Sequence, residues 1–224
     1  MYKGRNGILQ LLKPEEMEKL QEKGRILRLM KGQELFRERE TVHTVYFCTK
    51  GYFALHRSNR QQERRIVFVL AEGEVLNEIV LEQPVASVSA VALTDAEVLA
   101  VDRERLNGML QDCDRLREEL FNSCSLKLRR LYHQLANTSN NYRTDRLLAS
   151  KLWKLARDFG VECPQGLLIP FDVSVNFLAE SMGAKRETVS RAMAPLKKEG
   201  IILHSRNKVI IPDMGKLKKV SYNY

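Results

Sequence analysis

The sequence predicts an α+β fold in which a β-rich part is followed by a long helix and then by a smaller mixed part. Three patterns lead to this prediction. Short runs of β-branched and aromatic residues recur from about residue 24 to residue 101, leucines repeat at helical spacing up to residue 137, and short helical runs followed by a hairpin-like segment fill the remainder. At 224 residues the chain has room for one large domain or two modest ones.

The β-rich part is expected to begin after a short helix over residues 14–23. Glycines at positions 32, 51 and 73 separate the runs that follow. Several short strands at regular spacing are typical of a sandwich or a barrel. The expected strands cover residues 44–48, 52–56, 66–70, 87–92 and 98–101.

Residues 103–137 are expected to be helical because apolar residues recur at steps of three and four and no proline interrupts them. The expected helix could be interrupted at Gly108 or at residues 112–114, which would divide it into two helices. One face would pack on the β-rich part, and another could form the seam of a short coiled coil with a second subunit. The residues predicted for this dimer seam are Leu116, Leu120, Cys124, Leu128, Leu131 and Leu135.

Residues 138–144 are polar and are the best candidate for a hinge. An amphipathic helix over residues 145–159 follows, and Gly160 would end it. These boundaries give a β-rich domain over residues 1–102, a dimerisation helix over 103–137, a hinge over 138–144 and a final domain over 145–224.

The final domain carries the spacing of a helix-turn-helix. Ala179 is small enough for a second helix to cross closely, Gly183 permits the turn, and Val189 would pack the second helix on the first. Residues 201–211, with a polar turn at 205–208, indicate a β-hairpin, the wing of a winged helix. Pro195 should kink or end the second helix because it cannot bond to the Arg191 carbonyl.

The second helix of such a motif enters the DNA major groove. A guanidinium matches O6 and N7 of guanine, and a Glu carboxylate accepts from N4 of cytosine. The predicted base-reading residues are Arg186, Glu187, Ser190 and Arg191. The predicted phosphate contacts are Ser174, which would also cap the first helix, Lys185 and Thr188.

The charge distribution agrees with this interpretation. Residues 140–224 hold 15 Lys and Arg against 8 Asp and Glu, whereas residues 1–139 hold 22 against 20. Most of the net charge of +9 therefore lies in the part that carries the motif, as contact with the phosphates of double-stranded DNA requires.

Other classes of function find little support. None of the four cysteines forms a Cys-x-x-Cys pair, which argues against zinc and iron–sulfur sites, and no metal or cofactor is predicted. Cys113 and Cys124 could lie on one helix face and form a redox switch. The alternative is that both are packed thiols in a reducing compartment. His43 and His56 stand alone, so an enzyme on a β-barrel is disfavoured. Without a long apolar run or a secretory signal, we expect a cytoplasmic protein with no membrane partner.

The order of β-rich domain, long helix, hinge and winged helix-turn-helix, with Arg-Glu-Thr-Val-Ser-Arg at residues 186–191, resembles the superfamily of the cyclic-AMP receptor protein and the fumarate–nitrate regulator. The resemblance covers nearly the whole chain. It implies a β-roll, a double-stranded β-helix like that which binds cyclic nucleotides. It also implies a homodimer that bends a palindrome with TGTGA-like half-sites, where Arg186 and Arg191 contact guanines and Glu187 a cytosine. RNA polymerase would be a further partner.

Departures from the family pattern concern the effector. The cyclic-AMP pocket of the family uses a Gly-Glu pair and an Arg-Ser pair, and here Asn77 precedes Glu78 and Ala86 precedes Ser87. Without that arginine a buried phosphate near Glu78 would lack its cation, so we reject cyclic AMP as the effector. The N-terminal cysteine cluster of the oxygen sensors is also absent, since no cysteine precedes Cys48.

The resemblance places an effector, here an unknown small molecule, between the β-roll and the long helix. The residues that match pocket positions are Asn77, Glu78, Ser87, Ser89, Lys127 and Tyr132. The alternative is an effector-independent regulator whose β-roll serves only as a scaffold for dimerisation or protein contact.

Overall fold

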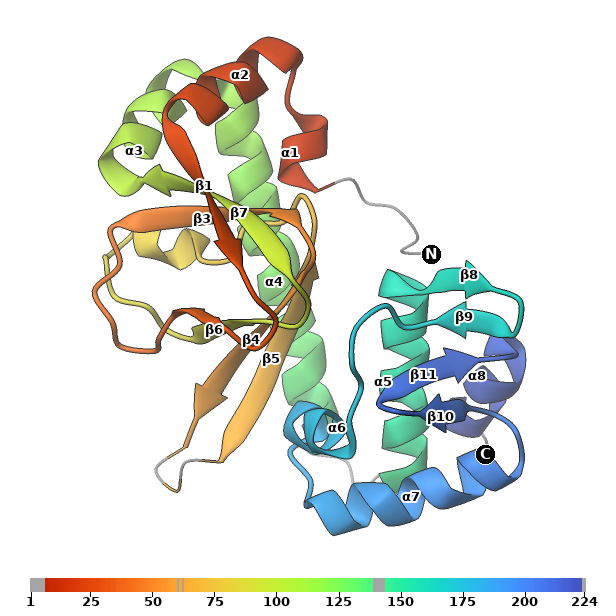
Figure 1. The fold of residues 1–224 in the computed structure, drawn as a ribbon. Coiled ribbons are helices and arrows are strands. Elements are labelled where there is room, and N and C mark those ends of the chain that lie inside the picture. Colours follow the sequence, from red (N-terminus) through yellow and green to blue (C-terminus); the bar gives the residue numbers. More distant parts are fainter. Residues whose placement is uncertain (1–6, 60, 62, 139–143, 223–224) are drawn as a thin grey trace. The chain divides into compact units, whose positions relative to one another are not determined.

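The computed structural model describes residues 7–59, 61, 63–138 and 144–222. The chain divides into two compact units, which we describe separately: the β-domain, mainly residues 6–57 and 67–140, and the C-terminal domain, mainly residues 141–224 (Figure 1). Within the described residues, no helix is both long and apolar enough to span a bilayer.

The β-domain is a β-roll preceded by two short helices, α1 (Ile8–Leu11) and α2 (Pro14–Glu22). One sheet has the order β1-β7-β3 and the other β2-β6-β4-β5, with antiparallel neighbours wherever the register is defined. The strands are β1 (Gly24–Leu29), β2 (Glu34–Phe36), β3 (Thr44–Lys50), β4 (Tyr52–Ser58), β5 (Arg64–Ala71), β6 (Ser89–Ala92) and β7 (Ala96–Asp102). Every strand expected from the sequence is confirmed, although β6 begins two residues later than expected.

The core of the β-domain lies between these sheets and is made of the inward side chains of the strands. Phe47 and Leu99 are paired across β3 and β7 and are buried, as are Phe53 and Leu55 on β4. Gly51 makes the tight turn from β3 to β4 at a φ of 88°, and a Cβ there would lie 2.8 Å from the carbonyl oxygen of Asp95. The turn therefore requires glycine on both conformational and steric grounds.

The helical segment after β7 consists of two helices, α3 (Arg103–Asp112) and α4 (Asp114–Thr138). Asp102 caps α3 by accepting from the backbone N–H groups of Glu104 and Arg105. Cys113 separates the helices with a non-helical backbone, at φ −125° and ψ 88°, so the break falls at the step over residues 112–114 and not at Gly108.

The C-terminal domain is a winged helix-turn-helix with a four-stranded antiparallel sheet in the order β10-β11-β9-β8 (Figure 1). Its core contains Leu148, Leu152 and Phe171. The elements are α5 (Thr144–Phe159), β8 (Val161–Cys163), β9 (Gly166–Leu168), α6 (Val175–Met182), α7 (Arg186–Lys198), β10 (Leu203–Ser205), β11 (Lys208–Ile211) and α8 (Met214–Tyr222). The first β-hairpin and α8 were not expected from the sequence.

The predicted hinge over residues 138–144 falls almost entirely outside the described residues, which end at Thr138 and resume at Thr144. Helix α5 then ends at Phe159, and the N–H of Gly160 donates to the Ala156 carbonyl at 2.8 Å. The prediction that Gly160 ends this helix is confirmed.

Candidate nucleic-acid interface

Helices α6 and α7 form the helix-turn-helix with the packing that the sequence predicts. The Ser174 hydroxyl caps α6 by accepting from the Phe177 N–H at 3.0 Å. Gly183 ends α6 in the left-handed conformation, with φ 62° and ψ 40°. Ala179 and Val189 are both buried where the two helices meet. The Ala-Gly-Val spacing therefore performs its expected steric roles.

One face of α7 is buried and the other is open. Val189, Ala192, Met193 and Leu196 face the core of the domain. The opposite face exposes all four residues predicted to contact DNA bases, which are Arg186, Glu187, Ser190 and Arg191. In the part of the chain that the structure describes, no hydrogen bond or ion pair involves the side chains of Arg186, Glu187 or Arg191. Their charges are thus available to an external partner.

The residues predicted to contact phosphate surround this face. Lys185 is exposed immediately before α7 and Thr188 is half-buried in its first turn. Ser174 is half-buried at the start of α6, where its hydroxyl is already engaged in the cap. The N-terminal N–H groups of α6 retain the partial positive charge that favours a phosphate.

Pro195 lies inside α7, which continues to Lys198. Of the two expected effects of this proline, the end of the helix is therefore wrong, and the kink stays a prediction. Pro195 has no N–H to donate to the Arg191 carbonyl, so one helical hydrogen bond is lost. Its own carbonyl still accepts from the Glu199 N–H at 2.9 Å, so the last helical turn keeps its hydrogen bond. The predicted reading residues all precede Pro195 and lie in the regular part of the helix.

The wing is a tight hairpin of β10 and β11. Arg206 and Asn207 have φ values of 48° and 63°, as a two-residue type I′ turn requires. The Asn207 carbonyl accepts from the Val173 N–H at 2.7 Å, and Lys208 Nζ lies 2.9 Å from Asp172 Oδ1. These contacts hold the wing against the segment just before α6.

His204 of β10 also faces this segment, with its Nε2 3.3 Å from the Val173 carbonyl oxygen. Burial lowers the pKa of His204 below its ordinary value. The wing therefore does not depend on a charged imidazole at neutral pH. Arg206 is exposed at the tip of the wing and carries a positive charge there. Sequence reasoning found the hairpin but did not single out Arg206.

Two of the predicted pocket residues hold the β-domain together. Asn77 Oδ1 accepts from the Tyr46 N–H at 2.9 Å and its Nδ2 donates to the Thr44 carbonyl at 2.8 Å. Ser89 Oγ accepts from the Glu38 N–H at 2.9 Å. Both side chains are buried and hydrogen-bonded to backbone groups of the β-domain, so they have a structural role there. Their part in an effector pocket stays a prediction.

Two other pocket residues come together. Lys127 Nζ of α4 lies 2.6 Å from Glu78 Oε2 and 2.6 Å from the Val75 carbonyl oxygen, and Ser123 Oγ donates to Glu78 Oε1 at 2.7 Å. Glu78 begins the short 3-10 helix η1 (Glu78–Leu81). Sequence reasoning missed Ser123, although it lies four residues before Lys127 on the same face. Ser87 and Tyr132 are exposed instead, and Tyr132 is 64% accessible.

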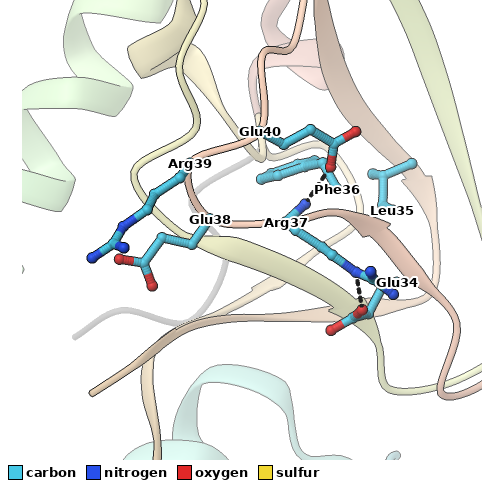
Figure 2. Close-up of a pocket in the computed structure, with 7 residues that line it drawn as sticks. All are labelled: Glu34, Leu35, Phe36, Arg37, Glu38, Arg39 and Glu40. Atoms are coloured by element: carbon cyan, nitrogen blue, oxygen red, sulfur yellow. Dashed lines mark hydrogen bonds and ion pairs between the residues drawn. The ribbon is translucent and has the colours of Figure 1, made fainter. Parts of the chain in front are cut away.

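A pocket opens elsewhere on the β-domain, lined by residues 34–40 (Figure 2). Arg37 Nε donates to Glu34 Oε2 at 2.8 Å, and the Arg37 N–H donates to Glu40 Oε2 at 2.8 Å (Figure 2). Arg57 pairs with Glu38 at 2.7 Å. Glu34 and Glu38 are thus paired with cations of the chain, whereas Glu40 accepts from a backbone N–H. None of the predicted pocket residues is among the residues that line this pocket.

The predicted dimer seam divides into two parts. Leu116 and Leu120 are buried in the core of the β-domain, at 1% and 4% exposure, so the prediction that they face a second subunit is corrected. Cys124, Leu128, Leu131 and Leu135 are exposed along α4. Phe121, which sequence reasoning missed, continues this stripe at 71% exposure.

Comparison with known proteins agrees with both domains. The model of the cyclic nucleotide-binding domain matches residues 26–113, and that of the Crp-like helix-turn-helix domain matches residues 148–220. The chain belongs to the superfamily of the cyclic-AMP receptor protein and the fumarate–nitrate regulator. It is a transcription regulator with a helix-turn-helix DNA-binding domain.

The relatives match over most of their length. A CRP-like cAMP-activated global transcriptional regulator of Mycobacterium tuberculosis is 24% identical over 216 residues, 96% of each chain. The cyclic AMP receptor protein of Thermus thermophilus is 27% identical over 85% of each chain. The c-di-GMP responsive global regulator CLP of Xanthomonas campestris has the same fold, with a TM-score of 0.79 at 20% identity over 90% of this chain and 100% of its own.

Proposed function

We propose that the chain acts as a homodimer that reads a palindromic DNA sequence, with α7 of each copy in the major groove of one half-site. The observation that carries this proposal is the exposed face of α7. Arg186, Glu187 and Arg191 project from a helix whose other face is buried, and no ion pair within the described residues neutralises them. Exposed polar side chains at the start of a second helix are what base reading requires.

The chemistry of this face favours half-sites that resemble TGTGA. Arg186 and Arg191 would each donate two hydrogen bonds to a guanine, and Glu187 would accept from a cytosine on the other strand. Lys185, Thr188 and the N-terminus of α6 would position the motif on phosphates. Ser190 is small and polar, and would allow the helix to approach closely.

The dimer is supported by the exposed stripe on α4. Phe121, Cys124, Leu128, Leu131 and Leu135 follow one another at steps of three and four residues, the spacing of a coiled-coil seam. The stripe has five exposed positions, and four of them are large apolar residues. Such a stripe favours burial against another helix, and α4 of a second copy, related by a two-fold axis, presents the same apolar stripe. Such a dimer would present two reading helices about 34 Å apart, one turn of DNA.

The test is the affinity of the purified protein for a palindromic duplex, measured by fluorescence anisotropy at fixed salt. We expect the duplex with two TGTGA half-sites to bind at least tenfold more tightly than a duplex whose half-site guanines are replaced. Each lost bidentate contact costs about 1–3 kcal/mol. Equal affinity for both duplexes would contradict base reading.

We further propose that cyclic AMP does not bind in the β-domain. Ala86 stands where the pocket would need an arginine, and Lys127 is already bonded to Glu78 and to the Val75 carbonyl. A different small molecule could gate the regulator, with RNA polymerase as the downstream partner. The alternative, a regulator that needs no effector, is favoured by one observation, since the chain itself supplies a partner for Glu78.

A further inference from the structure

The Glu78 carboxylate is held by α4 at both of its oxygens. Ser123 Oγ donates to one oxygen at 2.7 Å and Lys127 Nζ to the other at 2.6 Å. Lys127 Nζ also lies 2.6 Å from the carbonyl oxygen of Val75. Ser123 and Lys127 are four residues apart, so both project from the same side of α4. We call this set of contacts the α4 clamp.

The clamp is largely removed from water. The side chain of Glu78 is 6% exposed and that of Lys127 is 13% exposed. A charge at such a position is costly unless it is paired and its remaining hydrogen-bonding groups are satisfied. Here the two charges neutralise each other, and Ser123 and Val75 satisfy further positions. A second pair, Arg130 with Glu74 at 3.7 Å, lies one turn further along α4.

The clamp also determines which face of α4 is turned outward. With Ser123 and Lys127 bonded to the β-domain, the neighbouring residues Cys124, Leu128 and Leu131 are exposed. These are the residues of the proposed dimer seam. The contact that fixes α4 on its own β-domain therefore also presents the seam to a second copy.

We propose that Lys127 takes the place of a ligand group beside Glu78, so that the regulator dimerises and reads DNA with no small molecule bound in its β-domain. A ligand shifts an equilibrium only by its differential affinity for the two states. A lysine of the chain is present in every copy and needs no effector concentration. This inference rests on the proposed function and concerns how the same DNA-reading state is maintained.

The direct test uses wild-type protein freed of small molecules by unfolding in guanidinium chloride, dialysis and refolding. Native mass spectrometry should then show the mass of the protein alone. We expect its affinity for the TGTGA palindrome to lie within threefold of that of the untreated protein. Affinity lost by tenfold or more, and regained on adding the low-molecular-weight fraction of a cell lysate, would overturn the inference.

Variants test the residue assignment. Lys127→Met removes the cation of the clamp, whereas Arg129→Met removes an exposed cation from the same helix and serves as the matched control. We expect Lys127→Met to weaken binding to the palindrome at least tenfold and to raise the dimer dissociation constant, while Arg129→Met changes neither by more than threefold. Identical behaviour of the two variants would overturn the inference. Where Lys127→Met lowers the folded fraction in near-ultraviolet circular dichroism, the ligand-free wild-type protein decides.

The two proposals fail in different ways. If untreated wild-type protein shows no preference for the palindrome at low salt, the proposed function is wrong. If it prefers the palindrome but needs an added small molecule, base reading stands and only the role of Lys127 is overturned.

Discussion

Lys185 and Arg186 are neighbours in the chain, and both are exposed cations, yet the structure places them differently. Lys185 is the N-cap position of α7, whereas Arg186 is the first residue of the helix itself. A lysine at the edge of the motif suits a phosphate, which carries no sequence information. An arginine on the reading face offers the planar fork that matches guanine.

This difference predicts two distinct phenotypes. Arg186→Ala should weaken binding by about 1–3 kcal/mol and relax the preference at a single guanine. Lys185→Ala should weaken binding to all duplexes about equally and reduce the salt dependence by about one unit of slope. Anisotropy titrations against a panel of single-base variants measure both effects. Indistinguishable profiles would contradict the base-reading assignment.

Ser174 combines a structural role with a predicted phosphate contact, and two substitutions separate them. Ser174→Ala removes the cap of α6 and should lower the free energy of unfolding by about 1 kcal/mol. Ser174→Asp keeps a capping oxygen but adds a negative charge, so stability should be retained while DNA affinity falls. Thermal denaturation and anisotropy report the two properties. If Ser174→Asp binds DNA as well as wild type, Ser174 does not lie near a phosphate.

At the scale of elements, α6 and α7 could be predicted because their signal is local. Ala179, Gly183 and Val189 act through helix crossing and turn geometry, which spacing alone encodes. In helix α4, by contrast, the local pattern does not predict which apolar residues are buried. Leu116 and Leu128 occupy the same periodic pattern, yet one is in the core and the other is exposed. Periodicity identifies an apolar face but cannot say where the domain beneath it ends.

Asn77 shows a related difficulty. Its amide bonds to backbone groups of Thr44 and Tyr46, more than 30 residues earlier in the chain, and the sequence did not predict these contacts. Such long-range partners leave no signal in the local sequence. The β8–β9 hairpin was missed for another reason, since each of its strands has only three residues and carries too few alternating positions to be recognised. Helix α8 was also not expected from the sequence.

The stripe on α4 predicts the oligomeric state. Leu131→Glu places a charge in the proposed seam and should shift the protein to monomers in sedimentation analysis while the domains stay folded. Leu116→Ala is the contrasting variant, because it removes a core side chain and should lower stability by about 2–5 kcal/mol without acting on a seam. A Leu131→Glu protein that remains fully dimeric would place the interface elsewhere.

Thiol labelling provides an independent test of the same seam. Burial raises the pKa of Cys48 to about 12, so its thiolate is scarce at pH 8 and it should resist alkylation. Cys124 is exposed in the single chain but lies in the proposed seam. We expect iodoacetamide to modify Cys124 slowly in the wild-type dimer and at least tenfold faster in the Leu131→Glu monomer. Equal rates would argue against a seam at this position.

At the scale of the whole molecule, charge is divided between the two ends of the sequence. The part from residue 140 onward carries a surplus of basic residues, while the preceding part is close to neutral. Phosphate contacts release counterions, so the logarithm of the association constant for DNA should fall linearly with the logarithm of the salt concentration. The preference for the palindrome over unrelated DNA should persist as salt rises, because base contacts release no further counterions.

The measurement that tests the central claim most directly compares two palindromic duplexes that differ only in the spacing of their half-sites. One has half-site centres a full helical turn apart, and the other has about five extra base pairs, which rotate one half-site to the opposite side of the helix. We predict one dimer per duplex on the first and an affinity at least tenfold lower on the second. Equal affinity for both duplexes, or binding of a single chain to each half-site independently, would contradict the account.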